Sequence, residues 1–268
     1  MEEQSSLLIQ NKYKIIKFIG KGNYSHVYEG LHVIKNEKVA IKFDIQDNNI
    51  SKKLLQNEIS VYLKLLKHKT NHIANIKSFG LIGSRNYIIM DYLYMDLGKY
   101  FEENYNKISI ENINILLNNV FILIHNMHKT KIVHRDIKPD NFLFNNKNEL
   151  CVIDLGLSTD LDDIKSSNKI IGTPLFCSYN IHQKYYCYET HDDAISIYFM
   201  FFYLIGRQLP WENIHINDET IKQKVIYTLK KYTNFMDYYK HNANYENLLP
   251  IIKSYKNYLE NNEILFYS

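Results

Sequence analysis

Short apolar runs of the kind that form β-strands dominate the first third of the chain. They are rich in Ile, Val and Tyr, are separated by Gly, Asn and charged residues, and cover residues 13–19, 27–34, 39–43 and 87–90. Residues 54–66 instead repeat their apolar positions at helical spacing. The pattern up to about residue 92 therefore predicts a small sheet with a single helix.

From Leu97 onward the hydrophobic spacing becomes helical. The clearest stretch has apolar side chains at Ile113, Leu116, Leu117, Val120, Phe121 and Ile124. A β-like stretch at residues 141–153 interrupts this pattern. The apolar run at residues 195–205 is only about half as long as the roughly 20 residues that a membrane-spanning helix needs, so we expect it to be a buried core helix.

The change of pattern near residue 92 predicts an α+β fold of two lobes with a cleft between them. We expect an N-terminal tail at residues 1–12, a small β-rich lobe at residues 13–92 and a larger, mostly helical lobe at residues 93–268. The join between the lobes is short, and the chain contains no internal repeat or low-complexity linker.

Composition narrows the class of protein. The 268 residues are 46% hydrophobic and 23% charged, which allows a large core and excludes a disordered chain. A formal net charge of +3 without a long block of like charge does not indicate a nucleic-acid partner. The three cysteines form no CxxC pair, and the acidic, polar N-terminus is unlike a signal peptide. We therefore expect free thiols and an intracellular protein, in the cytoplasm or nucleus.

The first candidate for ligand binding is the sequence GKGNYSHVYEG, which begins at Gly20 after a predicted strand. Glycines at positions 20 and 22 would let backbone N–H groups approach phosphates, and Val27 would cover an adenine face. A plain hairpin turn explains the same glycines, and Ser25 replaces the third glycine of the usual pattern. This segment alone does not decide between the two interpretations.

The second candidate is the sequence VAIK, which ends at Lys42 on a predicted strand. A lysine between apolar neighbours either extends to solvent or reaches an anion. Glu58 shares a helical face with Leu54 and Tyr62, so its carboxylate points where apolar side chains point and needs a cationic partner. An unpaired buried charge would be costly, so we expect Lys42 to pair with Glu58.

The strongest motif is HRDIKPDN at residues 134–141, followed by IDLG at residues 153–156. Transfer of a γ-phosphoryl group needs a carboxylate near the attacking hydroxyl, a cation near the transferred group and oxygen ligands for magnesium. The two motifs supply these groups through Asp136, Lys138, Asn141 and Asp154. A turn rich in Asp, Asn and Pro is the alternative, but it does not explain why the motifs follow the glycine loop and VAIK in this order.

With these motifs in this order, the chain resembles a eukaryotic-type protein kinase over residues 13 to about 260. The resemblance implies ATP and Mg²⁺ as cofactors. The implied catalytic residues are Asp136, which accepts or orients the substrate hydroxyl proton, Lys138, which neutralises the γ-phosphate, and Asn141. Asn141 and Asp154 would hold the metal. The family's nucleotide-binding positions correspond to Ile19, Gly20, Gly22, Val27, Ala40, Lys42, Glu58, Met90, Asp91, Leu93 and Asp154.

Within that family the chain is most similar to the casein kinase I group. The similarity rests on SYN at residues 178–180, where most kinases have APE, and on HDDAISIYFMFFYLIGRQLPW at residues 191–211. It implies that Asp193 hydrogen-bonds the backbone of the catalytic loop, although a simple N-terminal helix cap would explain the same residue. It also implies that Thr173 contacts Asp136 and Lys138.

The chain departs from the casein kinase I pattern at two places. Leu175 replaces an arginine that usually binds an anion on the substrate, which puts a preference for phosphorylated substrates in doubt. The sequence also stops soon after LPIIKSYKNYL, so we expect a shortened C-terminus relative to that group.

The resemblance predicts a monomeric serine/threonine kinase that acts on protein Ser and Thr hydroxyls, with no direct nucleic-acid or membrane contact. One alternative is a pseudokinase that acts as a nucleotide-binding scaffold. The presence of all five charged or metal-binding motif residues favours the enzyme: Lys42, Glu58, Asp136, Asn141 and Asp154. The other alternative is a kinase similar to the vaccinia-related group. The intact HRDIKPDN motif and the short spacing between Glu58 and Asp136 favour casein kinase I.

Overall fold

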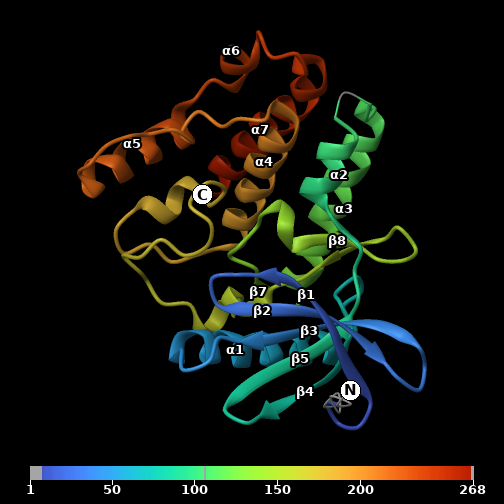
Figure 1. The fold of residues 1–268 in the computed structure, drawn as a ribbon. Helices are drawn as coiled ribbons and strands as arrows, with labels where there is room; N and C mark the ends of the chain where they lie inside the picture. Colours follow the sequence, from blue (N-terminus) through green and yellow to red (C-terminus); the bar gives the residue numbers. More distant parts are fainter. Residues whose placement is uncertain (1–7, 106, 267–268) are drawn as a thin grey trace. The chain divides into compact units, whose positions relative to one another are not determined.

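The computed structural model describes residues 8–105 and 107–266 (Figure 1). The chain divides into two compact units. The first is the described part of Met1–Met95 together with Leu143–Ser158, and the second is the described part of Asp96–Phe142 together with Thr159–Ser268. Most of the expected N-terminal tail, residues 1–7, lies outside the described residues.

A five-stranded antiparallel sheet forms the body of the first unit, with strand order β1-β2-β3-β5-β4. The strands are β1 (Tyr13–Lys21), β2 (Ser25–His32), β3 (Glu37–Asp44), β4 (Ile76–Ile82) and β5 (Arg85–Asp91). Four of them match the apolar runs of the sequence. β4 was not predicted, because its side chains alternate between half-buried and exposed positions and form no continuous apolar run.

One face of this sheet carries an apolar core. β3 and β5 contribute side chains that are 6% exposed or less, and the buried Ile9 and Tyr13 join them. The buried residues of this core are Ile9, Tyr13, Val39, Ile41, Phe43, Tyr87 and Ile89. Ile9 therefore packs with the sheet, although the sequence places it in the expected tail.

The single predicted helix of the first unit is α1 (Asn49–Lys67). It begins five residues before the predicted segment, because the side chain of Asn48 accepts a hydrogen bond from the backbone N–H of Ser51 and caps the helix. The buried face of α1 includes Leu55, Glu58 and Tyr62. α1 packs against β3 and β5 and thus lies beside the sheet, as Figure 1 shows.

Residues 143–158 belong to the first unit, whereas the sequence prediction assigned them to the second lobe. The segment contains most of β8 (Phe142–Phe144) and all of β9 (Leu150–Val152). These two strands and β6 (Met95–Asp96) form a three-stranded sheet of order β6-β8-β9. Hydrogen bonds attach it to the first unit. The N–H of Val152 donates to the carbonyl of His72, and the amide of Asn57 donates to the carbonyls of Gly156 and Ser158.

Helices form most of the second unit (Figure 1). They are α2 (Leu97–Glu103), α3 (Ile110–His128), α4 (Thr190–Gly206), α5 (Glu219–Tyr232), α6 (Phe235–Tyr239) and α7 (Tyr245–Phe266). Short 3-10 turns lie at η1 (Pro139–Asn141), η3 (Leu161–Asp163) and η4 (Tyr179–His182), and η2 (Leu155–Leu157) lies in the first unit. The strands β7 (Ile132–Val133) and β10 (Thr159–Asp160) pair with each other.

α4 is the central core element of the second unit, as its apolar run predicts. Phe199, Phe201 and Phe202 are completely buried, and the ring of Phe199 lies 4.7 Å from that of Trp211. Within the described residues, no helix combines the length and the apolar character that a membrane crossing needs.

Candidate active site

The register of the sheet brings several predicted nucleotide-binding residues to one face. Across the strands, Val27 lies opposite both Gly20 and Lys42. Ala40 lies opposite Met90 and is two residues from Lys42 on β3. Directly opposed residues, and residues two apart on a strand, point to the same side of a sheet. These five residues therefore share the face opposite to the apolar core.

The glycine loop is the turn of the β1–β2 hairpin. The N–H of Gly22 donates to the carbonyl of Ser25 at 2.9 Å, so the segment does form a hairpin turn. No atom lies within 4 Å of the position that a Cβ at Gly20 would take. The hairpin alone therefore does not require glycine there, and the open space leaves room for a ligand. Ile19, beside this turn, is 41% exposed.

Lys42 lies between two carboxylates of the first unit. Its Nζ is 2.7 Å from Oε2 of Glu58 on α1 and 2.7 Å from Oδ1 of Asp154, just before η2. The predicted Lys42–Glu58 pair is thus confirmed, and Asp154 joins it. Asp154 can reach Lys42 because residues 143–158 belong to the first unit.

Burial and charge act against each other in this cluster. Burial lowers the pKa of Lys42, but the charges of Asp154 and Glu58 outweigh it and hold the pKa above its ordinary value. Burial raises the pKa of Glu58 to about 7, and the charge of Lys42 only partly offsets that rise. One cation thus serves two carboxylates. The ammonium of Lys42 can therefore bind a further anion only if one of the two carboxylates is neutralised. A metal ion beside that carboxylate would neutralise it.

The remaining predicted nucleotide-binding residues follow β5. Met90 is 6% exposed, and Leu93 is half-buried. The carboxylate of Asp91 accepts a hydrogen bond from the amide of Asn75 and pairs with Lys77, each at 2.7 Å. The side chain of Asp91 is therefore already engaged, which leaves backbone groups as the means by which this segment could meet a base.

The second unit contains the HRDIKPDN segment, in which Asp136 is surrounded by polar partners. The hydroxyl of Thr173 donates to its Oδ1 at 2.7 Å, and Nζ of Lys138 lies 3.1 Å from its Oδ2. Nδ2 of Asn141 donates to the carbonyl of Asp136 at 2.8 Å. The predicted contact between Thr173 and Asp136 is confirmed. A buried carboxylate with a hydroxyl and an ammonium beside it is equipped to orient a hydroxyl and to take up its proton.

Asp193, at the start of α4, holds the backbone of this segment. Its carboxylate accepts hydrogen bonds from the N–H groups of His134 at 2.8 Å and Arg135 at 3.0 Å. His128 and Tyr188 bond the same carboxylate, at 2.8 and 2.7 Å. Burial opposes ionisation of Asp193, but the hydrogen bond and charge of His128, with smaller contributions from His134, hold its pKa below the ordinary value.

The helix-cap alternative for Asp193 is wrong. The N-cap of α4 is Glu189, and Asp192 completes a capping box with it, because the carboxylate of Asp192 accepts a hydrogen bond from the N–H of Glu189 at 2.8 Å. Sequence reasoning did not separate these adjacent aspartates, because both positions lie in the first turn of the helix.

Gly172 is a residue of this site that sequence reasoning missed. It has φ of +92°, and a Cβ at this position would overlap the carbonyl oxygen of Arg135. The backbone leading to Thr173 can therefore approach the HRDIKPDN segment only because residue 172 has no side chain. The glycine is visible in the sequence GTPLFC, but its partner is distant along the chain.

Two predicted magnesium ligands offer oxygen atoms of the type that the ion prefers. Nδ2 of Asn141 is used as a donor, so its Oδ1 is the atom suited to a cation. The side chain of Asp154 is 39% exposed, which leaves its carboxylate accessible. Among the described residues no group of three or more His, Cys, Asp or Glu side chains could hold a metal. Magnesium usually takes one or two carboxylates and completes its shell with water and phosphate.

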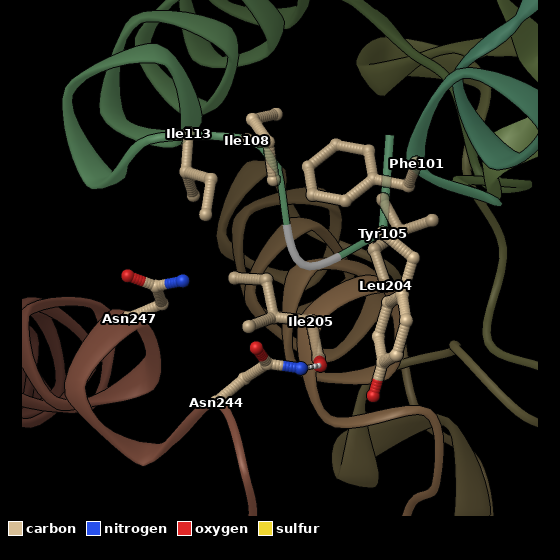
Figure 2. Close-up of a pocket in the computed structure, with 8 residues that line it drawn as sticks. All are labelled: Phe101, Tyr105, Ile108, Ile113, Leu204, Ile205, Asn244 and Asn247. Carbon is tan, nitrogen blue, oxygen red and sulfur yellow. Dashed lines mark hydrogen bonds between the residues drawn. The ribbon is translucent and has the colours of Figure 1, made fainter. Parts of the chain in front are cut away.

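A separate small pocket lies among α2, α3, α4 and the start of α7 (Figure 2). The space between its walls, open solvent included, amounts to about 240 Å³, and the lining residues are Phe101, Tyr105, Ile108, Ile113, Leu204, Ile205, Asn244 and Asn247. The amide of Asn244 already donates to the carbonyl of Ile205. Among the described residues that line the pocket there is no cation and no predicted site residue.

Comparison with known proteins identifies the family of the chain. The protein kinase domain family matches residues 13–260. Casein kinase I homolog RAG8 of Kluyveromyces lactis is 29% identical over 245 residues, which cover 87% of this chain and 45% of that protein. Casein kinase I homolog 1 of Saccharomyces cerevisiae has the same identity and coverage. Casein kinase I homolog 2 of Schizosaccharomyces pombe is 26% identical over 250 residues, which cover 88% of this chain and 56% of that protein.

The chain spans about half the length of the curated relatives it matches. The family match extends over the β-rich first unit, the HRDIKPDN segment and most of the helices. The predicted α+β kinase fold is confirmed. The chain belongs to the protein kinase family and is similar to casein kinase I homologues.

Proposed function

We propose that this chain transfers the γ-phosphoryl group of ATP to serine and threonine hydroxyls of protein substrates. The observation that carries the proposal is the environment of Asp136, whose buried carboxylate lies 3.1 Å from the Lys138 ammonium and accepts a hydrogen bond from Thr173. Lys138 is the residue that the serine/threonine-type motif has at this position. The family to which the chain belongs supports the same activity.

The first unit provides the groups that suit a nucleotide. The open space at Gly20 gives room for phosphates, and Val27, Ala40 and Met90 offer an apolar face for the base. Lys42 supplies a cation for the α- and β-phosphates, and Glu58 fixes the direction of its ammonium. Asn141 and Asp154 would hold Mg²⁺, which neutralises charge on the phosphates when it is bound.

The second unit provides the groups that act on the protein substrate. Asp136 orients the substrate hydroxyl and takes its proton as the oxygen forms a bond to the γ-phosphorus. The bond between that phosphorus and the bridging oxygen breaks, and ADP leaves. Lys138 balances the negative charge near Asp136 during the transfer. Asp193 keeps the backbone on which Asp136 lies in place.

The substrate surface differs from that of related kinases at Leu175, which cannot bind a phosphate on the substrate by charge. We therefore propose that the enzyme accepts unphosphorylated proteins as readily as phosphorylated ones. We also propose that it acts as a monomer inside the cell, in the cytoplasm or nucleus. All three cysteines are free thiols, as expected for a reducing compartment.

The test is transfer of labelled γ-phosphate from Mg-ATP to dephosphorylated casein and to phosphorylated casein. We expect label on serine and threonine of both caseins at similar rates, and loss of transfer when a chelator removes Mg²⁺. Absence of transfer together with magnesium-dependent ATP binding would contradict the proposal and indicate a nucleotide-binding scaffold. A strong preference for phosphorylated casein would contradict only the interpretation of Leu175.

A further inference from the structure

A fully buried lysine lies behind the segment that carries Thr173. Lys230, on α5, has an exposed fraction of 0%. Its Nζ donates to the carbonyl oxygens of Pro174 at 2.7 Å and Cys177 at 2.6 Å. The third contact is with Sγ of Cys177, at 3.4 Å. An ammonium has three N–H donors, so these contacts use all of them.

The surroundings of Lys230 are aromatic and not acidic. Its Nζ lies 5.4 Å from the ring centroid of Trp211 and 5.9 Å from that of Phe199. Among the described residues, Lys230 has no carboxylate partner. Burial lowers the pKa of Lys230, and the thiol of Cys177 only partly offsets this effect. A methionine of similar shape would avoid the desolvation cost of the charge, but it would leave the carbonyls of Pro174 and Cys177 without the donor that Lys230 supplies.

Trp211 provides a second attachment for the same segment. Its indole N–H donates to the carbonyl of Leu175 at 2.8 Å. Lys230 and Trp211 together therefore bind three of the four carbonyls between residues 174 and 177. Leu175 thus belongs to a segment whose backbone is held at residues 174, 175 and 177.

The same segment reaches the catalytic carboxylate. The carbonyl of Thr173 accepts hydrogen bonds from the N–H groups of Phe176 and Cys177, each at 3.0 Å, which closes a tight turn. The hydroxyl of Thr173 then donates to Asp136. A continuous series of contacts thus runs from Lys230, through the turn at residues 173–177, to Asp136.

We propose that Lys230 is a positioning residue, whose ammonium holds residues 173–177 as a platform for the protein substrate beside Asp136. This inference rests on the proposed kinase function and adds to it the residue that shapes the platform. Lys230 does not touch the reacting atoms. It acts through the carbonyls of Pro174 and Cys177, which a charged donor binds more strongly than a neutral one.

The test compares Lys230→Met with Lys231→Met, the same substitution one residue further along α5. Lys231 is exposed, and its Nζ bonds Tyr227 instead of the platform. We expect Lys230→Met to raise the KM for casein about tenfold while the KM for ATP changes by less than about twofold. Hydrogen exchange of the Phe176 and Cys177 amides should become faster in Lys230→Met. Lys231→Met should match the wild type in all three measurements.

Trp211→Phe provides a second variant in case Lys230→Met does not fold. It removes the hydrogen bond to Leu175 and keeps an aromatic ring, so we expect the same changes with a smaller size. A wild-type KM for casein and wild-type exchange in Lys230→Met would overturn the proposal. A fall in kcat with both KM values unchanged would also overturn it, because that result indicates a purely structural role.

The two proposals can fail separately. Absence of transfer by the wild-type protein would contradict the kinase function. The exchange measurement on the full chain would still decide whether Lys230 holds the segment, since amide exchange does not depend on catalysis. Unchanged exchange in both Lys230→Met and Trp211→Phe would overturn the positioning role even in an active enzyme.

Discussion

The hydroxyl of Thr173 donates a 2.7 Å hydrogen bond to Oδ1 of Asp136, from a segment 37 residues further along the chain. Gly172, the residue before Thr173, permits this contact because any side chain there would overlap the carbonyl of Arg135. The carboxylate of Asp136 is thus held by a residue outside its own motif, in addition to Lys138 within the motif. The arrangement links the proposed substrate platform to the proposed catalytic base.

Removal of this contact should slow catalysis. Thr173→Ala leaves Asp136 without a hydrogen bond of about 1.5–3 kcal/mol, so we expect kcat to fall by roughly tenfold to hundredfold. Thr173→Ser keeps the hydroxyl and should retain most of the activity. The measurement is kcat on casein at saturating Mg-ATP. Equal kcat values for the alanine and serine variants would show that the hydroxyl has no role in the reaction.

Asp193 should be important for stability as well as for the geometry of the catalytic loop. The carboxylate of Asp193 takes part in four hydrogen bonds. Asp193→Asn replaces one of its oxygens by an NH₂ group, which is a donor and would face the donors that this oxygen now binds. We expect the free energy of unfolding to fall by at least about 3 kcal/mol. Tyr188→Phe removes only one of the four bonds and should cost about 1–2 kcal/mol. Urea unfolding of both variants measures this, and similar losses for the two would contradict the bracing role.

Glu58 should make stability depend on pH near neutrality. Its pKa is about 7 in the folded protein, against about 4.3 in an unfolded chain. The folded state therefore holds an extra proton between these values, and the associated stability is present at low pH and lost as the pH rises through 7. Glu58→Gln cannot titrate at this position. The free energy of unfolding of the wild type minus that of Glu58→Gln should thus decrease between about pH 5 and about pH 8.

Urea unfolding of both proteins across this range gives the difference directly. Glu103→Gln is a suitable control, because the side chain of Glu103 is 50% exposed and its loose pair with Lys99 spans 3.8 Å. That substitution should leave the pH dependence of the wild type unchanged. A difference between wild type and Glu58→Gln that is constant or increases with pH would rule out the assignment of a raised pKa to Glu58.

Two buried tyrosines should respond oppositely to removal of their hydroxyls. The hydroxyl of Tyr62 is buried and, among the described residues, has no hydrogen-bond partner. Tyr62→Phe should therefore leave stability unchanged or raise it by up to about 1 kcal/mol. The hydroxyl of Tyr239 donates to the carbonyl of Gln208 at 2.6 Å. Tyr239→Phe should lower the free energy of unfolding by about 1 kcal/mol, and the reverse order in urea unfolding would refute this reasoning.

The parts of the site that sequence predicted are those whose cause is local. The hydrophobic face of α1 includes Glu58, which correctly indicated a buried carboxylate in need of a cation. The HRDIKPDN motif predicted a polar group around Asp136, and Lys138 and Asn141 of the same motif contact Asp136. In each case the spacing within one helix, strand or turn carries the information.

The parts that sequence did not predict depend on contacts between distant segments. Residues 143–158 join the first unit through hydrogen bonds from Asn57 and to His72, which no local pattern indicates. Gly172 is required only because of the backbone at Arg135. A lysine on an amphipathic helix is usually exposed, so the burial of Lys230 could not be read from α5 alone.

The most direct test of the account is the effect of Asp136→Asn on phosphoryl transfer and on nucleotide binding. Asp140→Asn is the matched control, since Asp140 is exposed in the same motif. We expect Asp136→Asn to lower the rate of transfer from Mg-ATP to casein by orders of magnitude while ATP affinity stays nearly unchanged. Asp140→Asn should retain the wild-type rate. Transfer by Asp136→Asn at the wild-type rate would contradict the role of Asp136 as the base that acts on the substrate hydroxyl.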